Sequence, residues 1–130
     1  MGRKWRRKMK LHQDNPSGFN RFTGYGEGYV MVNGERYEKS LLVMPDSPVV
    51  AWGVEDFSQL ATAHFDMLFE LTPEIVLLGT GRSQRFPHPR LYGMLIGAHI
   101  GVEVMDTDAA CRTYNILMSE GRSVAAALIL

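Results

Sequence analysis

Short β-prone runs separated by turn residues fill the first half of the chain. Residues 29–32 form one such run, and Asn33-Gly34 follows it directly. That pair favours a two-residue hairpin turn because both residues tolerate a positive φ. Residues 35–38 are then the return strand, and further strands are predicted over 41–44 and 49–52. The pattern predicts an antiparallel meander in this half of the chain.

The second half of the chain changes to a helical period. Pro89 is suited to a first helical position, and Leu91, Met94 and Leu95 then follow the spacing of one helix face. The predicted elements come in this order: helix 62–72, strand 75–78, helix 89–98, strand 102–105, helix 107–120 and strand 124–130. From residue 75 onward, strands and helices of these lengths favour right-handed crossovers between parallel strands.

Together these patterns predict an α/β protein with α+β character. Its mixed sheet joins an N-terminal antiparallel meander to a C-terminal βαβαβ unit. A chain of 130 residues with 45% hydrophobic residues has the size and composition of one globular domain, which we expect over residues 11–130. No apolar run reaches the ~18–20 residues that a membrane-spanning helix needs, so no membrane span is predicted.

Charge changes this picture at the N-terminus. Residues 1–10 carry six basic and no acidic side chains, whereas the rest of the chain has eight basic and 14 acidic ones. We expect residues 1–10 to be a disordered basic arm on an acidic body, and a native start at Met9 is a further interpretation of the same residues. An arm that binds nucleic acid or an anionic membrane is disfavoured, because only the aromatic Trp5 accompanies the charges.

The chain has a single cysteine, Cys111, which excludes an intramolecular disulfide and fits a reducing compartment. Its place beside Arg112, near the start of the last predicted helix, makes it a candidate nucleophile, with His88 as the best-placed base. A small buried packing residue is the favoured interpretation. The four histidines lack metal-ligand spacing, so the sequence predicts no metal site and no cofactor.

A candidate binding site lies at two predicted loops. Ligands of open parallel α/β sheets bind outside the carboxyl ends of the strands, and such loops follow the strands 75–78 and 102–105. Glycines permit close backbone approach, hydroxyls and arginines donate hydrogen bonds, and a helix N-terminus favours negative charge. We predict a small-anion site formed by these residues: Gly79, Thr80, Gly81, Arg82, Ser83, Arg85, Thr107 and Arg112.

Several features of the same loops favour other interpretations. Asp106 and Asp108 bring negative charge to the site, and Asp106 is a second weak catalytic candidate beside Cys111. Gln84 stands where a dinucleotide fingerprint needs its last glycine, and the chain has no P-loop motif. The glycines therefore have an equally favoured interpretation as parts of a tight strand-to-helix turn, with solvated or paired arginines beside them.

The chain also resembles a known family of small proteins of unknown function. The resemblance covers nearly all of residues 9–130 and rests on these segments: MKLH at 9–12, YGEGY at 25–29, EIVLLGTG at 74–81, QRF at 84–86, GVEVMDT at 101–107 and ACRTYN at 110–115. The family is widespread in bacteria, and its relatives include a mitochondrial assembly factor of respiratory complex I and an adipogenesis-associated cytosolic protein. The resemblance implies a three-layer β/β/α domain with a mixed sheet, no established enzymatic activity, and a cytoplasmic location.

Three functions remain, in order of preference. The first is a non-enzymatic accessory or assembly protein that binds another protein through an exposed face. The second is a small-anion or metabolite-binding protein, with enzymatic activity left open, that uses the Gly79-Thr80-Gly81 loop and the start of the last helix. The third is nucleic-acid binding through the basic arm. The sequence does not determine the ligand, the partner or the oligomeric state.

Overall fold

The computed structural model of the protein describes residues 18–130 and contains two β-sheets and three α-helices. The basic arm predicted at residues 1–10 lies outside the described residues. The three-stranded sheet is formed by β1 (Phe22–Gly26), β2 (Tyr29–Val32) and β3 (Glu35–Tyr37). The five-stranded sheet contains β4 (Leu41–Val43), β5 (Val50–Ala51), β6 (Ile75–Thr80), β7 (Gly101–Met105) and β8 (Val124–Ile129). The α-helices are α1 (Thr62–Leu71), α2 (Gly93–Gly97) and α3 (Thr107–Ser119).

The five-stranded sheet is mixed and has the strand order β5-β4-β8-β6-β7. β6 pairs in parallel with both β7 and β8, whereas β4 pairs antiparallel with β5 and β8. The central strand β8 has the sequence VAAALI, and each of its residues is buried. A strand that is covered on both faces needs such a continuous apolar run, which is the pattern that predicted it.

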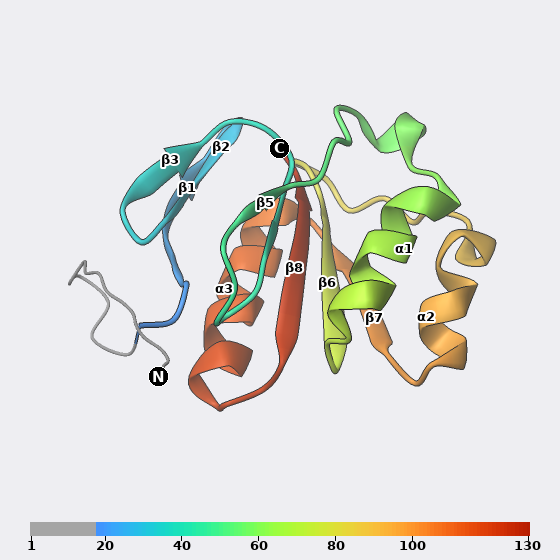
Figure 1. Cartoon of the computed structure of the whole chain (residues 1–130). Coiled ribbons are helices and arrows are strands. Elements are labelled where there is room, and N and C mark those ends of the chain that lie inside the picture. The colour runs from blue at the N-terminus through green and yellow to red at the C-terminus, as the bar shows by residue number, and fades with distance from the viewer. Residues whose placement is uncertain (1–17) are drawn as a thin grey trace.

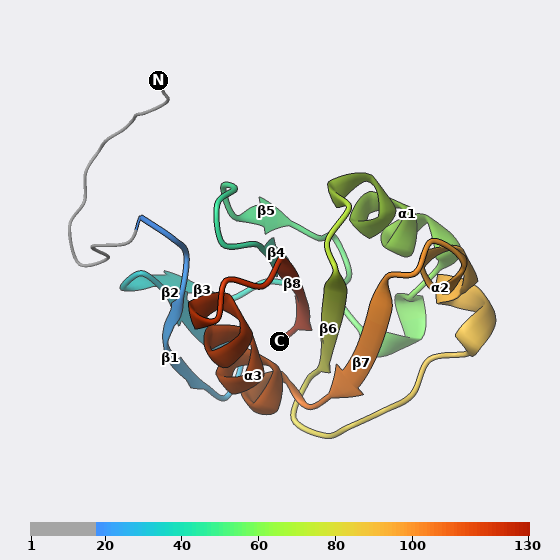
Figure 2. The ribbon, with the colours of Figure 1, turned by 90° about the horizontal axis from the view of Figure 1, so that it is seen from below.

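The two faces of this sheet belong to two separate cores. α3 packs on β6 and β8 over one face and also contacts β1, so it lies between the two sheets. α1 and α2 cover the opposite face, as Figures 1 and 2 show. Alternate residues of β8 point to the two sides: Val124, Ala126 and Leu128 join the core of α3, and Ala125, Ala127 and Ile129 join that of α1 and α2.

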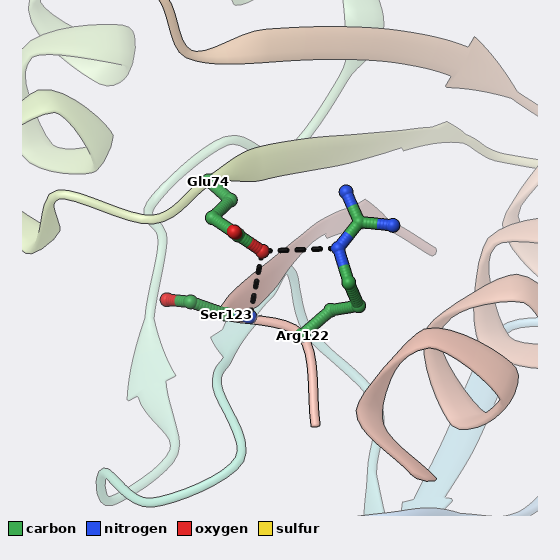
Figure 3. Close-up of polar contacts among 3 residues, drawn as sticks. All are labelled: Glu74, Arg122 and Ser123. Atoms are coloured by element: carbon green, nitrogen blue, oxygen red, sulfur yellow. Dashed lines mark hydrogen bonds and ion pairs between the residues drawn. The ribbon is translucent and has the colours of Figure 1, made fainter. Parts of the chain in front are cut away.

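An ion pair connects the residues just before β6 to those just before β8 at one end of the sheet. The Glu74 carboxylate oxygen Oε1 accepts hydrogen bonds from Arg122 Nε at 3.0 Å and from the Ser123 backbone N–H at 3.2 Å (Figure 3). These bonds hold the pKa of Glu74 below its usual value, the bond from Arg122 most strongly. The pair is exposed, so it adds little to stability at neutral pH.

The structure confirms the predicted fold class and places strands and helices close to the predicted positions. The hairpin turn has φ values of +52° at Asn33 and +84° at Gly34, as the sequence pair predicts. The predicted meander, however, divides between the two sheets after β3, because α3 packs between them. All three residues of β4 are buried, whereas Glu35 and Arg36 of β3 are exposed. The predicted helix 89–98 is a 3-10 turn, η2 (Pro89–Tyr92), that continues into α2. No helix within residues 18–130 has the length and apolar character to cross a membrane.

Candidate functional site

A cavity of about 230 Å³ lies where β6 ends and α3 begins. Four parts of the chain form it: the turn between β1 and β2, the loop after β6, the start of α3 and the end of β8. Its lining residues are Gly26, Glu27, Gly28, Tyr29, Gly81, Arg82, Asp106, Thr107, Asp108 and Leu130. The two loops predicted to form a site therefore meet at one edge of the sheet, as expected for parallel strands.

Thr107 fastens these two loops together. Its backbone N–H donates to the Gly81 carbonyl at 2.8 Å, and its hydroxyl Oγ1 accepts from the Gly81 N–H at 2.8 Å. The same hydroxyl donates to the Ile129 carbonyl at 2.6 Å. The Thr107 side chain is buried, and its hydroxyl proton is already donated to a protein carbonyl. Thr107 therefore has a structural role, because these bonds hold α3 against the sheet.

The two glycines of the Gly-Thr-Gly segment have separate geometric reasons. A Cβ at Gly79 would lie 2.7 Å from Leu128 Cδ2 and 3.0 Å from Thr107 Cα, so α3 approaches the strand where only a hydrogen fits. Gly81 has a φ of +95°, which a residue with a side chain rarely adopts. Helix packing therefore requires Gly79, and the turn requires Gly81, whether or not a ligand binds.

Three of the predicted site residues organise the turn and do not line the cavity. The buried Thr80 hydroxyl donates to the Ser83 carbonyl at 2.7 Å and accepts from the Arg85 N–H at 3.0 Å. The Arg85 guanidinium lies over the ring of Phe57, 4.4 Å from its centroid, in a cation–π contact. The structure thus brings Arg82 and Thr107 together at the cavity and leaves Arg85 outside it.

The charge around the cavity is mixed. Arg82 Nη1 forms a salt bridge of 2.8 Å with Glu27 Oε2 of the β1–β2 turn, and both side chains are largely exposed. Asp106 caps α3 by accepting a hydrogen bond from the Ala109 N–H at 2.8 Å, and Asp108 is the acidic residue of the first helical turn. Three carboxylates and one guanidinium line the cavity, so its charge balance opposes a small anion.

Arg112, also predicted for this site, lies outside the lining residues. Its Nη1 is 3.3 Å from the Tyr25 hydroxyl, to which it donates. That contact raises the pKa of Arg112 above its ordinary value, and Asp106 and Asp108 add to the effect. Arg112 therefore connects α3 to the end of β1.

Cys111 is a fully buried residue of α3 and belongs to the core between this helix and the sheets. Burial raises the pKa of its thiol to about 12, and the charges of Asp108 and Asp106 add to this against the opposing effect of Arg112. A nucleophilic cysteine needs a thiolate, which this environment suppresses. The proposed base His88 instead uses Nδ1 to accept the Arg90 N–H at 3.1 Å at the start of η2. These positions favour the packing interpretation of Cys111.

The turn between β1 and β2 was missing from the predicted site. Gly26, Glu27, Gly28 and Tyr29 line the cavity opposite Arg82, although they precede it by more than fifty residues. A Cβ at Gly26 would lie 2.5 Å from the Tyr29 ring, so a glycine there lets the ring fold over the backbone. The one signal in the sequence was the YGEGY segment, which the family resemblance singles out.

Metal ligation and disulfide chemistry have no geometric support in the described part of the chain. Within residues 18–130, no three His, Cys, Asp or Glu side chains group closely enough to hold a metal ion.

Comparison with known proteins gives the following matches. A family model described as "Protein of unknown function (DUF498/DUF598)" matches residues 22–129. The chain is 30% identical over 110 residues to a "13 kDa major membrane protein" of Francisella tularensis. This alignment covers 83% of this chain and 89% of that protein. It is 39% identical over 108 residues to the human "NADH dehydrogenase [ubiquinone] 1 alpha subcomplex assembly factor 3", covering 81% of this chain and 58% of that protein.

Two solved structures of Bordetella proteins are similar along most of their length. A crystal structure from Bordetella parapertussis has a TM-score of 0.82 at 41% identity and covers 86% of this chain and 96% of that chain. A solution structure from Bordetella pertussis, described as an Mth938-like domain, has a TM-score of 0.79 at 35% identity and covers 93% of this chain and 92% of that chain. The chain thus has the fold of Mth938-like domains.

Proposed function

Because the chain belongs to the DUF498/DUF598 family, we propose that it is an accessory protein that acts by binding another protein. The observation that carries the proposal is a concentration of exposed apolar side chains in and before α2. Phe86 is 71% exposed, Met94 49% and Ile96 52%, and all three lie within eleven residues. Three of the four most exposed large apolar side chains within residues 18–130 thus belong to one short segment, and gathered apolar surface is typical of interaction sites.

Two further findings support a binding role. Relatives that are 30–40% identical to this chain are named as assembly factors of NADH dehydrogenase, and the aligned part spans about three-fifths of the human protein. In addition, the best catalytic candidate of the sequence, Cys111, has a buried thiol with a raised pKa. A protein-binding role uses the exposed segment and requires no reactive group.

Affinity purification of three tagged forms tests this proposal. The forms are the unmodified protein, a Phe86→Ser/Ile96→Ser double variant, and an Ile116→Ser control at an exposed apolar position on α3. We expect a specific protein to be recovered by the unmodified and control forms and to be at least tenfold depleted from the double variant. Recovery of the same proteins by all three forms would contradict the proposal.

A second function, the binding of a small ligand, has one observation in its favour. The cavity of about 230 Å³ is walled by residues that are far apart in the chain, with the Arg82 guanidinium at its side. A ligand present at 100 times its Kd stabilises a protein by about 2.7 kcal/mol. A thermal-shift screen of anionic metabolites and of amines on the unmodified protein and on Arg82→Ala tests this function. A shift that is lost in Arg82→Ala supports it, and no shift from any compound contradicts it. The cytoplasmic location stays a prediction.

A further inference from the structure

The exposed apolar side chains belong to a stretch of the chain with unusual charge. Residues 82–100, here called the basic-apolar segment, contain three arginines and no carboxylate. The remaining described residues, 18–81 and 101–130, contain five basic and 13 acidic side chains. The protein therefore concentrates positive charge and exposed apolar surface in the same segment of an otherwise acidic body.

The fold carries this segment from the end of β6 to the end of the molecule opposite the three-stranded sheet. Arg82, at the start of the segment, still lies beside that sheet, because it pairs with Glu27 of the β1–β2 turn. Both ribbon views show α2 at the far end (Figures 1 and 2). Pro87 and Leu95 are buried and anchor the segment, whereas Phe86 and Ile96 are exposed. The anchors position the backbone that carries the exposed side chains, which lowers the cost of ordering the segment on binding.

Two carboxylates lie near arginines of the segment and offset part of their charge. Arg82 is paired with Glu27, but the two side chains are 78% and 75% exposed, and such surface pairs exchange partners at little cost. Hydrogen bonds from Ser58 hold the pKa of Asp56 below its ordinary value, and the charge of Arg85 adds to the effect. The basic-apolar segment thus carries three arginines with two exposed carboxylates at its border.

We propose that the basic-apolar segment is a docking surface for a segment of a partner protein that carries both acidic and apolar side chains. The inference rests on the proposed protein-binding function and adds the chemistry of the partner. Phe86, Met94 and Ile96 provide apolar area, and the arginines of the same segment match acidic side chains of the partner. Complementary charge also accelerates the encounter and rejects basic partners.

Three other occupants fit this surface less well. A second copy that docks through the same segment brings three arginines against three arginines, which is repulsive. Strand addition at the open edge of β7 is obstructed, because Gln84 Nε2 donates to the Val104 carbonyl at 2.9 Å along that strand. A flat anionic membrane meets the acidic body as well as the segment, whereas a narrow peptide contacts the segment alone.

Peptide binding measured by fluorescence anisotropy tests the inference. The probes are a labelled twelve-residue peptide of glutamate, leucine and phenylalanine, and the same peptide with every glutamate replaced by glutamine. We expect the acidic peptide to bind at least tenfold more tightly than the neutral one, and to lose this preference as salt is raised. Equal binding of the two peptides, or no binding of the acidic one, overturns the inference.

Matched variants locate the binding. Arg85→Glu/Arg90→Glu reverses two charges within the segment, and Arg21→Glu/Lys39→Glu makes the same change in net charge elsewhere. The acidic peptide is expected to bind at least fivefold more weakly to the first variant and equally well to the second. Equal loss in both variants overturns the inference, because it shows a response to net charge only.

Vesicles separate the membrane alternative from the proposal. With vesicles of 30% phosphatidylserine in phosphatidylcholine, we expect no more sedimentation of the protein than with pure phosphatidylcholine. Strong binding to the anionic vesicles without binding of the acidic peptide overturns the inference in favour of a membrane. Affinity purification can recover a partner with the unmodified protein and lose it with Phe86→Ser/Ile96→Ser, although the acidic peptide does not bind. In that case the protein-binding function stands and only the proposed chemistry of the partner is wrong.

Discussion

The close approach of α3 to β6 predicts a large effect of one added methyl group. In Gly79→Ala, the new Cβ meets Leu128 Cδ2 at 2.7 Å and Thr107 Cα at 3.0 Å. Leu128 is fully buried, and Thr107 is held by hydrogen bonds to Gly81 and Ile129, so neither neighbour has room to retreat.

Overpacking of this kind costs about 1–3 kcal/mol. This cost opposes and exceeds the gain of about 0.5–1 kcal/mol that replacement of a glycine brings where the backbone is compatible. For a domain of this length, the melting temperature is expected to fall by roughly 3–5 °C per kcal/mol. Urea unfolding followed by circular dichroism gives the free energy of unfolding. If the slope of this free energy against urea concentration is unchanged, the substitution has altered stability and not the surface exposed on unfolding.

Gly93→Ala is the matched control. Gly93 has helical backbone angles of φ −59° and ψ −33°, and a Cβ built there meets no heavy atom within 4 Å apart from its chain neighbours and the backbone of its own helix. The same chemical change should therefore leave stability unchanged or raise it by about 0.5–1 kcal/mol. If Gly79→Ala unfolds at the same urea concentration as the unmodified protein, the tight packing between β6 and α3 is refuted.

Other parts of the structure give further predictions. The Cys111 thiol should react with Ellman's reagent at pH 8 only after unfolding, because it is buried and its pKa is raised to about 12; rapid reaction of the native protein would contradict this. Tyr114→Phe should cost about 0.5–1.5 kcal/mol in urea unfolding, since the buried ring donates its hydroxyl proton to the Asn20 carbonyl at 2.9 Å; an unchanged midpoint would show that the bond is not stabilising. The lowered pKa of Glu74 stabilises the native state above the pKa of the unfolded chain, and this contribution is lost as the pH falls through the native pKa. Glu74→Gln should therefore show a smaller loss of stability between neutral and acidic pH than the unmodified protein, and an identical pH profile would refute the role of Arg122.

Local patterns predicted most of the fold because the relevant forces act between near neighbours in the chain. The hairpin at Asn33-Gly34 follows from backbone freedom, and the buried strands β6 and β8 follow from their continuous apolar runs. The separation of β3 from β4 depends on α3 entering between the two sheets. That packing joins residues far apart in the sequence, so local patterns did not predict that the two sheets separate.

The candidate site was predicted in part for the same reason. Strand polarity alone placed Gly81 beside Thr107, because the carboxyl ends of parallel strands share one edge. The direction of long side chains depends on tertiary neighbours: Phe57 attracts Arg85 away from the cavity, and Glu27 of the first hairpin pairs with Arg82. Small-anion binding at this site stays a prediction, and the carboxylates at the cavity weigh against it.

Photo-crosslinking in cells tests the protein-binding function most directly. A benzoylphenylalanine placed at position 86 lies in the exposed basic-apolar segment, and one placed at position 116 lies on the exposed face of α3 and serves as the control. The proposed function predicts a discrete adduct of higher mass from position 86 that is absent from position 116 and that mass spectrometry identifies as another protein. Identical adducts from both positions, or none from position 86, would contradict it.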